Sequence, residues 1–523
     1  MQLCLTNPDV LKIVIKELDK KINDAPGLEY WSVSQNDDIG ACECENCTAL
    51  NKKHGSYQGS LLTFINQIAA KYPDKTISTL AYNFSRKAPV GLKPLENVNI
   101  MFSAIDINRS KPVNSDPRSE RFRIDYDAWE KLTSNIIVWD YVVQFTNYIS
   151  PFPNFHTLKP NFEYFSKNQP EGFFIQGSVE VPGELAEIRA YILSKLLWDK
   201  DADLEEIKSE FLDNYYGNAG VLVGKYINLI HEHVHSSWRR MDIYDNPIMP
   251  YQSYLSPKLL NEYLEILGSA ERLVIEDTEL TKRVQKVALP LHFAVLQQAR
   301  FFGIDQNGVF IKQNKNWVVR EEIRTKLQYF LGLLGKLEIT QLNESGLSPK
   351  DYEAEWKRIF DAGPIIHKAL NKPLRLLTES TPEFVSKGAR TLLDGTGGTE
   401  DFQYNWLGWN GTDMKVEIDM EEKTTLHKIE LSFLENHRHY MFLPKAISIE
   451  LSDDAKNYKE VARMAVEGPF ENVSVPVRKF ILDLGSKKAR YIKLIAINQT
   501  DLPLWCKRKD RKPWILTDEI IVK

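Results

Sequence analysis

Short strand-like runs alternate with helical patterns through the first 200 residues, and this alternation limits the fold more than any other feature of the chain. The runs are rich in β-branched and aromatic residues, and amphipathic segments such as Ser60–Tyr72 and Pro182–Trp198 lie between them. Repeated strand–helix–strand units build parallel sheets. We therefore expect parallel strands at Leu28–Ser34, Thr76–Tyr82, Asn97–Ile105, Asn135–Tyr141 and Gly172–Gly177.

These five strands are too few to close a (β/α) barrel, which needs eight. They predict the C-terminal part of a TIM-type (β/α)8 barrel, truncated at its N-terminus, over residues 1–203. An all-α domain is expected over 204–381, and short strands with turn signals such as Asp394-Gly395 predict a C-terminal β-sandwich over 382–523. The helices expected in the middle domain are Glu205–Tyr215, Leu222–Trp238, Pro257–Ile275, Leu280–Phe302 and Arg320–Ile339.

Charge and hydropathy argue against a nucleic-acid partner and against a transmembrane segment. The chain has 66 basic and 71 acidic residues, and neither sign forms the long runs that follow a phosphate backbone, so nucleic acid is not expected. No stretch of about 18 uninterrupted apolar residues is present, so no transmembrane segment is expected. Trp, Tyr and Phe make up 11% of the chain, and many lie in loops, where aromatic faces can stack on sugar rings.

Acidic residues follow three of the expected strands. Asp37 and Asp38 come after the first strand, Asp140 lies at the end of the fourth, and Glu180 follows the fifth. Because the C-terminal strand ends of a barrel form its active-site face, these carboxylates are candidate catalytic groups; a helix cap or a turn is the alternative for Asp37 and Asp38. Glycoside hydrolysis needs a protonated acid and a charged group opposite it, and a 2-acetamido group of the sugar can act as nucleophile instead.

Four further side chains are expected at the same rim. Tyr82, Trp139 and Tyr141 have aromatic faces with polar tips, and Gln176 has a polar amide, which together suit a sugar ring and its hydroxyls. We therefore expect them to bind substrate, with a core position as the alternative for Tyr82.

Cysteines are concentrated near the start of the chain. Cys42, Cys44 and Cys47 form a CxCxxC motif, and Cys4 supplies a fourth thiol if the fold brings it alongside. Four thiolates make a closed structural zinc site, whereas an exported protein more often oxidises such thiols to disulfides. Cys42 and Cys44 could bridge each other only with strain, so zinc and disulfides both stay open and no connectivity follows.

A second motif points to a different chemistry. The residues from His231 to His235 satisfy the HExxH pattern, which on a helix offers His231 and His235 to zinc with Glu232 as general base. This motif predicts a zinc metalloprotease as a rival function. A solvated helix face is the alternative.

Several segments within about the first 240 residues are similar to those of one family. They are Ser34-Gln35-Asn36-Asp37 with the CxCxxC motif, Ala81-Tyr82, Val138-Trp139-Asp140-Tyr141, Pro151-Phe152-Pro153-Asn154 and Arg189-Ala190-Tyr191. In combination they resemble a bacterial family described as a domain of unknown function, whose relatives include endo-β-N-acetylglucosaminidases that act on N-glycans. The resemblance implies that the earlier barrel strands and an export signal lie upstream of Met1. It also implies a secreted, periplasmic or cell-surface enzyme of glycan foraging.

The last part of the chain resembles another family. Leu393-Asp394-Gly395, Trp406-Leu407-Gly408-Trp409, Leu443-Pro444-Lys445 and Thr517-Asp518-Glu519-Ile520 are similar to segments of discoidin-like (coagulation factor 5/8 type C) modules, which serve many glycosidases as carbohydrate-binding domains. This resemblance implies a structural Ca²⁺ held by Asp394 and Glu519, since calcium takes oxygen ligands. The Trp pair is expected either in the binding site or in the core.

The sequence thus favours a retaining glycoside hydrolase of the N-acetylhexosaminidase or endo-β-N-acetylglucosaminidase type, which needs no catalytic cofactor. Asp37 or Asp38 would be the acid, and Asp140 or Glu180 the second group. The alternative is a non-catalytic glycan-binding protein, and the third hypothesis is the HExxH protease. A glycan is the expected partner in the first two cases, while the sugar, the linkage and the oligomeric state do not follow from the sequence.

Overall fold

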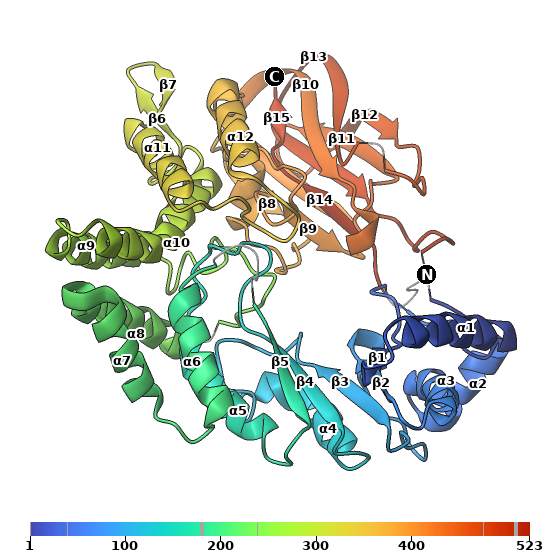
Figure 1. Cartoon of the computed structure of the whole chain (residues 1–523). Helices are drawn as coiled ribbons and strands as arrows, with labels where there is room; N and C mark the ends of the chain where they lie inside the picture. The colour runs from blue at the N-terminus through green and yellow to red at the C-terminus, as the bar shows by residue number, and fades with distance from the viewer. Residues whose placement is uncertain (1, 39, 178–182, 238, 474, 507–510) are drawn as a thin grey trace. The chain divides into compact units, whose positions relative to one another are not determined.

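The computed structural model describes every residue except 1, 39, 178–182, 238, 474 and 507–510. The chain forms two compact units (Figure 1). The first comprises residues 1–245, 252–291 and 333–349, and the second comprises residues 246–251, 292–332 and 350–523. The domain boundaries expected from the sequence, after residues 203 and 381, stay predictions.

Unit 1 is built on a curled, five-stranded parallel sheet that has the form of a half-barrel (Figure 1). Its strands are β1 (Tyr30–Ser32), β2 (Thr76–Ala81), β3 (Val98–Ser103), β4 (Ile136–Tyr141) and β5 (Gly172–Gln176), hydrogen-bonded in chain order. Each lies inside the range expected for it. The described residues of this sheet do not close into an eight-stranded barrel.

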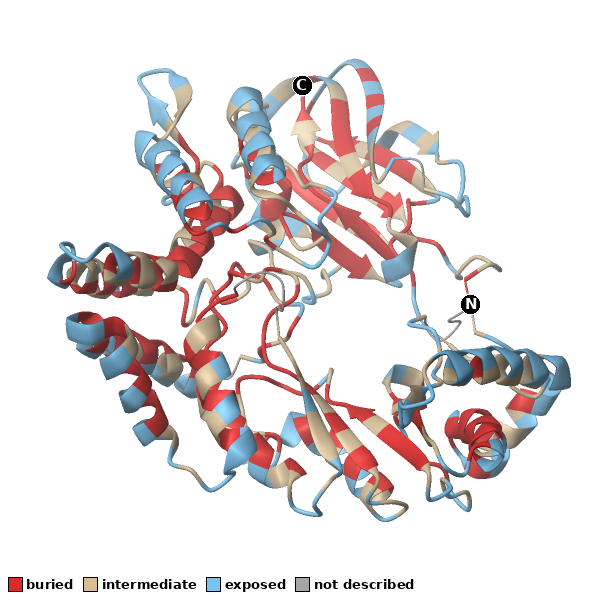
Figure 2. Ribbon diagram, viewed as in Figure 1, coloured by how far each residue is buried: buried red, intermediate tan, exposed pale blue. Residues whose placement is uncertain are grey.

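Alternating side chains fix which face of the sheet is covered. Ile77, Ile100 and Val138 are fully buried in one apolar cluster with side chains of α3 (Gln58–Lys71) and α4 (Glu120–Glu130). The residues between them point to the other face. Figure 2 shows β2, β3 and β4 as largely buried. This burial is consistent with the β-branched residues in their sequences.

Four further helices accompany these strands in the sequence. They are α1 (Pro8–Asp24) before β1, α2 (Glu45–His54) before α3, α5 (Phe155–Phe165) between β4 and β5, and α6 (Ala186–Trp198) after β5. Asn7 caps α1 by accepting from the N–H of Asp9. Helix α6 begins at Ala186, later than expected, and Pro182 lies outside the described residues.

The middle of the chain is helical, as expected, but it also contains a hairpin. The helices are α7 (Leu204–Tyr216), α8 (Gly220–Ser236), α9 (Pro257–Leu273), α10 (Thr278–Phe302), α11 (Glu321–Lys336) and α12 (Pro349–Ala362). An antiparallel pair, β6 (Phe310–Gln313) and β7 (Asn316–Val319), interrupts them, so the all-α expectation was wrong for this segment. Asn314 takes a positive φ of 56° in the turn, a conformation that Asn tolerates better than most residues.

A β-sandwich ends the chain, as the sequence predicted. Its main strands run in the order β12-β11-β13-β10-β14-β9, and β8 (Leu374–Leu376) and β15 (Ile521–Val522) also pair with β10. The bounds are β9 (Leu407–Asn410), β10 (Met414–Leu434), β11 (Ala446–Ser452), β12 (Lys459–Ala465), β13 (Val477–Ile497) and β14 (Trp514–Thr517). Strands β10 and β13 are each 21 residues long and pair with each other along most of that length, with register shifts near Asp419 and Leu426, and so contribute to both layers.

The sandwich core settles the position of the tryptophan pair. Trp406 and Trp409 are both 0% exposed, and each indole N–H donates to a backbone oxygen, of Thr399 and Thr378 respectively. Both therefore belong to the core, the second of the two positions expected for them.

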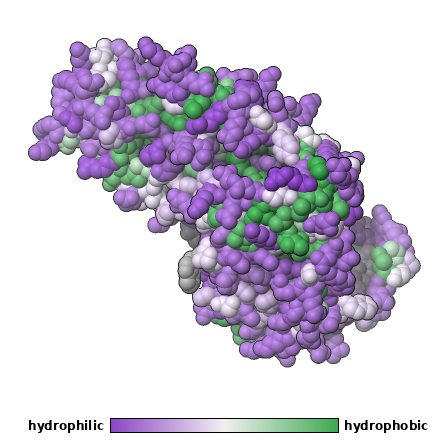
Figure 3. Space-filling model, turned by 90° about the vertical axis from the view of Figure 1, so that its left-hand side faces the viewer, coloured by the Kyte–Doolittle hydropathy of each residue, from purple (hydrophilic) through white to green (hydrophobic). Residues whose placement is uncertain are grey.

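No helix among the described residues is both long enough and apolar enough to cross a bilayer. Figure 3 shows one face of the molecule, on which hydrophilic side chains predominate and hydrophobic ones form separate patches.

Candidate functional site

Five of the predicted site residues form one connected strip at the C-terminal ends of the parallel strands. The Tyr82 hydroxyl donates to Asp37 Oδ1 over 3.1 Å, and the Tyr82 ring stacks on Trp139 with centroids 5.8 Å apart. Trp139 also stacks on Tyr141 at 5.2 Å and donates from Nε1 to Gln176 Oε1 over 2.7 Å. We call Tyr82, Trp139 and Tyr141 the aromatic strip. It carries a carboxylate at one end and an amide along its side.

The sheet register explains why the strip forms. Trp139 lies opposite Ser103 on β3 and Phe174 on β5, and Tyr141 lies opposite Gln176. These side chains therefore share the face of the sheet opposite to the helix-covered one. Asp37 is exposed, and Tyr82 and Trp139 are half-buried, so solvent reaches this part of the strip. Burial raises the pKa of Tyr141 above its ordinary value, which keeps the phenol protonated.

The other predicted carboxylates have different surroundings. Asp140 is buried, and its Oδ1 accepts from Arg109 Nη1 and from the N–H of Tyr141 over 2.8 Å. Alternation along β4 directs it away from the face that carries Trp139. Asp38 is half-buried and its main chain contacts the Gln2 side chain, while Glu180 lies outside the described residues.

Sequence reasoning missed two buried arginines near these strand ends. Arg109 holds Asp140, and Arg189 pairs with Glu184 while donating to Asn154 Oδ1. Burial raises the pKa of Glu184, and the Arg189 guanidinium opposes that shift. Asn154 and Arg189 both lie in segments that resemble the domain-of-unknown-function family. That resemblance was the only signal in the sequence that could have identified them.

The four cysteines named from the sequence come together. The sulfur atoms of Cys4, Cys42, Cys44 and Cys47 all lie within 4.8 Å of one another. Cys4 Sγ is 3.5 Å from Cys44 Sγ and 4.0 Å from Cys47 Sγ, both far beyond a disulfide bond length of about 2.05 Å. The cluster has the donor set and spacing to bind a metal ion.

Local folding determines the ionisation of these thiols. Cys44 caps α2, and the backbone N–H of Cys47 with the Thr6 hydroxyl lowers the pKa of Cys44 to about 6. At Cys42 the N–H of Cys44 lowers the pKa, but burial and the neighbouring thiols outweigh it and raise the pKa to about 12.

The HExxH motif does not form a zinc site, and this prediction was wrong. Both ring nitrogens of His231 are already used: Nδ1 lies 2.6 Å from Ile227 O, and Nε2 accepts from the N–H of Phe155 over 3.1 Å. Burial lowers the pKa of His231 well below its ordinary value. Among the residues that the structure describes, the cysteine cluster is the only group of three or more His, Cys, Asp or Glu side chains with metal-ligating spacing.

The residues expected to hold calcium also have other partners. The Asp394 carboxylate binds the Lys387 ammonium, with Oδ2 and Nζ 2.6 Å apart. Glu519 accepts from His367 Nε2 over 2.7 Å and from the backbone N–H groups of Asp394 and Gly395 over 3.0 and 2.8 Å. An internal cation and three N–H donors thus satisfy the two carboxylates, so these residues do not fit the calcium ion that the resemblance implied.

One end of the sandwich carries aromatic and polar groups that were not predicted. His437 stacks on Phe442 with centroids 4.9 Å apart, lies 4.8 Å from the Trp505 ring, and contacts Glu435 Oε1 through Nε2 over 2.9 Å. His437 and Trp505 are half-buried, so solvent reaches both rings. We call His437, Phe442 and Trp505 the sandwich aromatic cluster.

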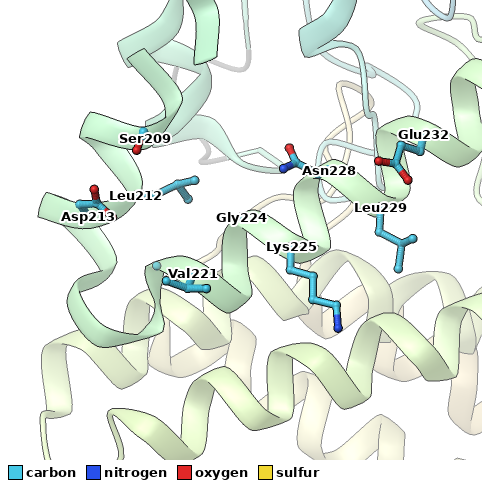
Figure 4. Close-up of a pocket in the computed structure, with 10 residues that line it drawn as sticks. Ser209, Leu212, Asp213, Val221, Gly224, Lys225, Asn228, Leu229 and Glu232 are labelled. Atoms are coloured by element: carbon cyan, nitrogen blue, oxygen red, sulfur yellow. The ribbon is translucent and has the colours of Figure 1, made fainter. Parts of the chain in front are cut away.

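A hollow of about 580 Å³ lies elsewhere, along α7 and α8 (Figure 4). Its lining includes Leu212, Val221, Lys225 and Glu232, and no aromatic side chain is among the lining residues. It therefore lacks the stacking surfaces of the aromatic strip.

Two family models match parts of the chain. Residues 1–228 match the model described as Domain of unknown function (DUF4838), and residues 377–510 match the F5/8 type C domain. Among curated proteins, none matches the chain.

Similar solved structures include three modules. They are CpGH89CBM32-6 produced by Clostridium perfringens, a fucose-binding module of Streptococcus pneumoniae, and chitosan-binding module 1 of a chitosanase/glucanase from Paenibacillus. Each is 14% identical and covers 30% of this chain and 98% of its own, with TM-scores of 0.21, 0.22 and 0.20 respectively. The chain is thus similar to a domain of unknown function (DUF4838) over residues 1–228 and to the F5/8 type C (discoidin) domain over residues 377–510.

Proposed function

We propose that this chain binds glycans along the aromatic strip of the half-barrel sheet. The observation that carries the proposal is the continuous stack of Tyr82, Trp139 and Tyr141, with Asp37 at one end and Gln176 beside it. Stacked rings offer apolar faces to the C–H face of a pyranose, and the carboxylate and amide offer hydrogen bonds to its hydroxyls. A carbohydrate ligand needs both kinds of contact.

The F5/8 type C domain supports a second glycan contact. Domains of this kind serve many glycosidases as carbohydrate-binding modules, and this copy carries the sandwich aromatic cluster where solvent reaches His437 and Trp505. Two contacts on one polymer raise the apparent affinity when both can be engaged at once. A role in glycan foraging also implies a location outside the cytoplasm.

Hydrolysis is the second candidate function, and the pairing of Asp37 with Tyr82 favours it. In hydrolysis assisted by a 2-acetamido group, the protein must orient the amide so that its oxygen attacks the anomeric carbon. A carboxylate can accept the amide N–H while an adjacent hydroxyl donates to the amide oxygen. Because Asp140 is engaged by Arg109, we assign this orienting role to Asp37 and Tyr82. Asp38, the other acid predicted at this rim, would protonate the leaving oxygen, and water would then open the cyclic intermediate, in a retaining reaction on β-N-acetylhexosaminides or N-glycans.

Isothermal titration with N-glycans and chito-oligosaccharides tests binding at the strip. Trp139→Ala should weaken binding about tenfold or more, since a lost hot-spot aromatic costs more than about 1 kcal/mol. Trp198→Ala is the matched control, because Trp198 is 94% exposed at the end of α6. Equal affinity in wild type and Trp139→Ala would overturn the proposed site.

Turnover of aryl β-N-acetylglucosaminides, beside the matching β-glucosides, tests hydrolysis. The acetamido mechanism predicts turnover of the first substrate only, with loss in both Asp37→Asn and Tyr82→Phe. Turnover of both substrates would contradict acetamido participation. Binding of the N-acetyl sugars without turnover would leave a glycan-binding protein, the alternative that the sequence also offered.

A further inference from the structure

The cysteine cluster joins two segments that are distant in the sequence. Cys4 precedes α1, Cys42 and Cys44 lie in the loop between β1 and α2, and Cys47 lies in the first turn of α2. If four sulfurs surround one zinc ion at about 2.3 Å, the edges of their tetrahedron are about 3.8 Å long. The Cys4–Cys44 and Cys4–Cys47 distances of 3.5 and 4.0 Å lie on either side of that value.

The backbone around the sulfurs is arranged for negative charge. The N–H of Cys47 donates to Cys44 Sγ over 3.5 Å, and backbone N–H groups of Cys44 and Thr6 point to the sulfurs of Cys42 and Cys47. The N-terminus of α2 adds the positive end of a helix dipole. Hydrogen bonds of this kind orient and stabilise thiolate ligands in metal sites.

We propose that Cys4, Cys42, Cys44 and Cys47 bind one Zn²⁺ as a closed structural site that fixes the rim loop carrying Asp37. The bound ion ties the segment before α1 to the loop after β1. Two residues before Cys4 in that segment, Gln2 donates from Nε2 to Asn36 O over 2.7 Å and accepts from the N–H of Asn36 over 3.1 Å. Through these contacts the zinc site positions the residue adjacent to Asp37.

Zinc content provides the direct test. The full chain, purified without a metal-affinity step, should contain one zinc per chain by elemental analysis. Cys47→Ser and Cys4→Ser should lose it, and Cys506→Ser, which changes a buried cysteine of the sandwich, should retain it. Cobalt added after zinc removal should give the visible absorption of a tetrahedral thiolate complex, which tests the site in the unmutated chain if a variant fails to fold.

Two results would overturn the zinc site. One is the absence of stoichiometric zinc and of the cobalt spectrum. The other is a non-reduced intact mass lower by two hydrogens for each pair of cysteines in the cluster, because that loss shows disulfides in place of thiolates. Either result refutes the zinc site whether or not the chain binds glycan.

Hydrogen exchange tests whether the zinc site positions the loop that carries Asp37. This part of the proposal is the only one that rests on the proposed function. Removing zinc should increase amide exchange in residues 33–38 and 40–42 and weaken glycan binding, and Gln2→Ala should reproduce part of both effects with zinc still bound. Zinc loss without a change in these amides would refute the positioning role. Changed exchange with unaffected glycan affinity would instead refute the proposed binding site.

Discussion

The cysteine cluster of unit 1 and the carboxylate cluster of Asp394 and Glu519 in unit 2 were both predicted to bind metal, yet they differ in what neutralises them. Each carboxylate is satisfied by donors from its own chain: Lys387 for Asp394, and His367 with two backbone N–H groups for Glu519. The sulfurs contact one another, Thr6 and backbone N–H groups. A sequence motif therefore identifies a candidate metal site. Whether a metal ion is needed there depends on whether side chains of the protein, such as the Lys387 ammonium beside Asp394, already neutralise the ligands.

Metal chelation should give the largest difference in stability between the cysteine cluster and the carboxylate cluster. We expect a strong zinc chelator to lower the stability of unit 1 by about 4 kcal/mol, the linkage value when free zinc exceeds its dissociation constant a thousandfold. A calcium-selective chelator should leave the melting temperature unchanged. Differential scanning calorimetry of the full chain measures both, and an equal response to the two chelators would contradict the comparison.

Replacing the internal cation should make the carboxylate cluster respond to calcium. Lys387→Met leaves Asp394 buried without its ammonium partner, which costs about 3–5 kcal/mol in denaturant unfolding. Added Ca²⁺ should restore part of this stability in the variant and none in the wild type. Lys372→Met, at the exposed pair with Glu421, is the matched control and should change little. Equal stabilisation of wild type and variant by Ca²⁺ would show that Lys387 does not replace the ion.

The pH dependence of unit 2 should come partly from Glu519. Burial and the charge of Asp394 raise its pKa from 4.5 to about 9, so the folded state binds the proton more tightly than the unfolded state. This contribution is complete below about pH 4.5 and is lost as pH rises towards about 9. We expect the unfolding free energy to fall across that range by a few kcal/mol at most, and Glu519→Gln to flatten the profile. An unchanged slope in Glu519→Gln would show that the three N–H donors keep the carboxylate ionised throughout.

The smallest expected effect concerns a hydroxyl beside the sulfurs. Thr6 Oγ1 lies 3.3 Å from Cys47 Sγ and 3.6 Å from Cys44 Sγ, and Thr6→Val removes this contact at nearly constant volume. A lost hydrogen bond of about 1 kcal/mol should weaken zinc binding several-fold in competition with a chromophoric chelator, without loss of stoichiometry. Thr63→Val, whose hydroxyl bonds Gly59 O within α3, should leave zinc affinity unchanged. A several-fold loss in the Thr63 variant as well would point to general destabilisation.

Sequence patterns predicted the helices and strands better than they predicted the contacts between side chains that are distant in the sequence. Short runs of β-branched and aromatic residues between helical segments located all five parallel strands, because such side chains pack well on a pleated, half-buried surface. The β6–β7 hairpin was missed because its two strands are only four residues long and its turn depends on the conformation of Asn314. Tertiary partners were missed for a different reason. Arg109 beside Asp140 is 31 residues away in the sequence, and no local pattern records such a pair.

The two longest strands of the sandwich have a mechanical consequence. Because β10 and β13 run through both layers as one paired ladder, neither layer can open while the other stays closed without breaking backbone hydrogen bonds in the same two strands. Pulling on the ends of this ladder would load many bonds in shear at once. The domain is thus expected to resist force as a single element.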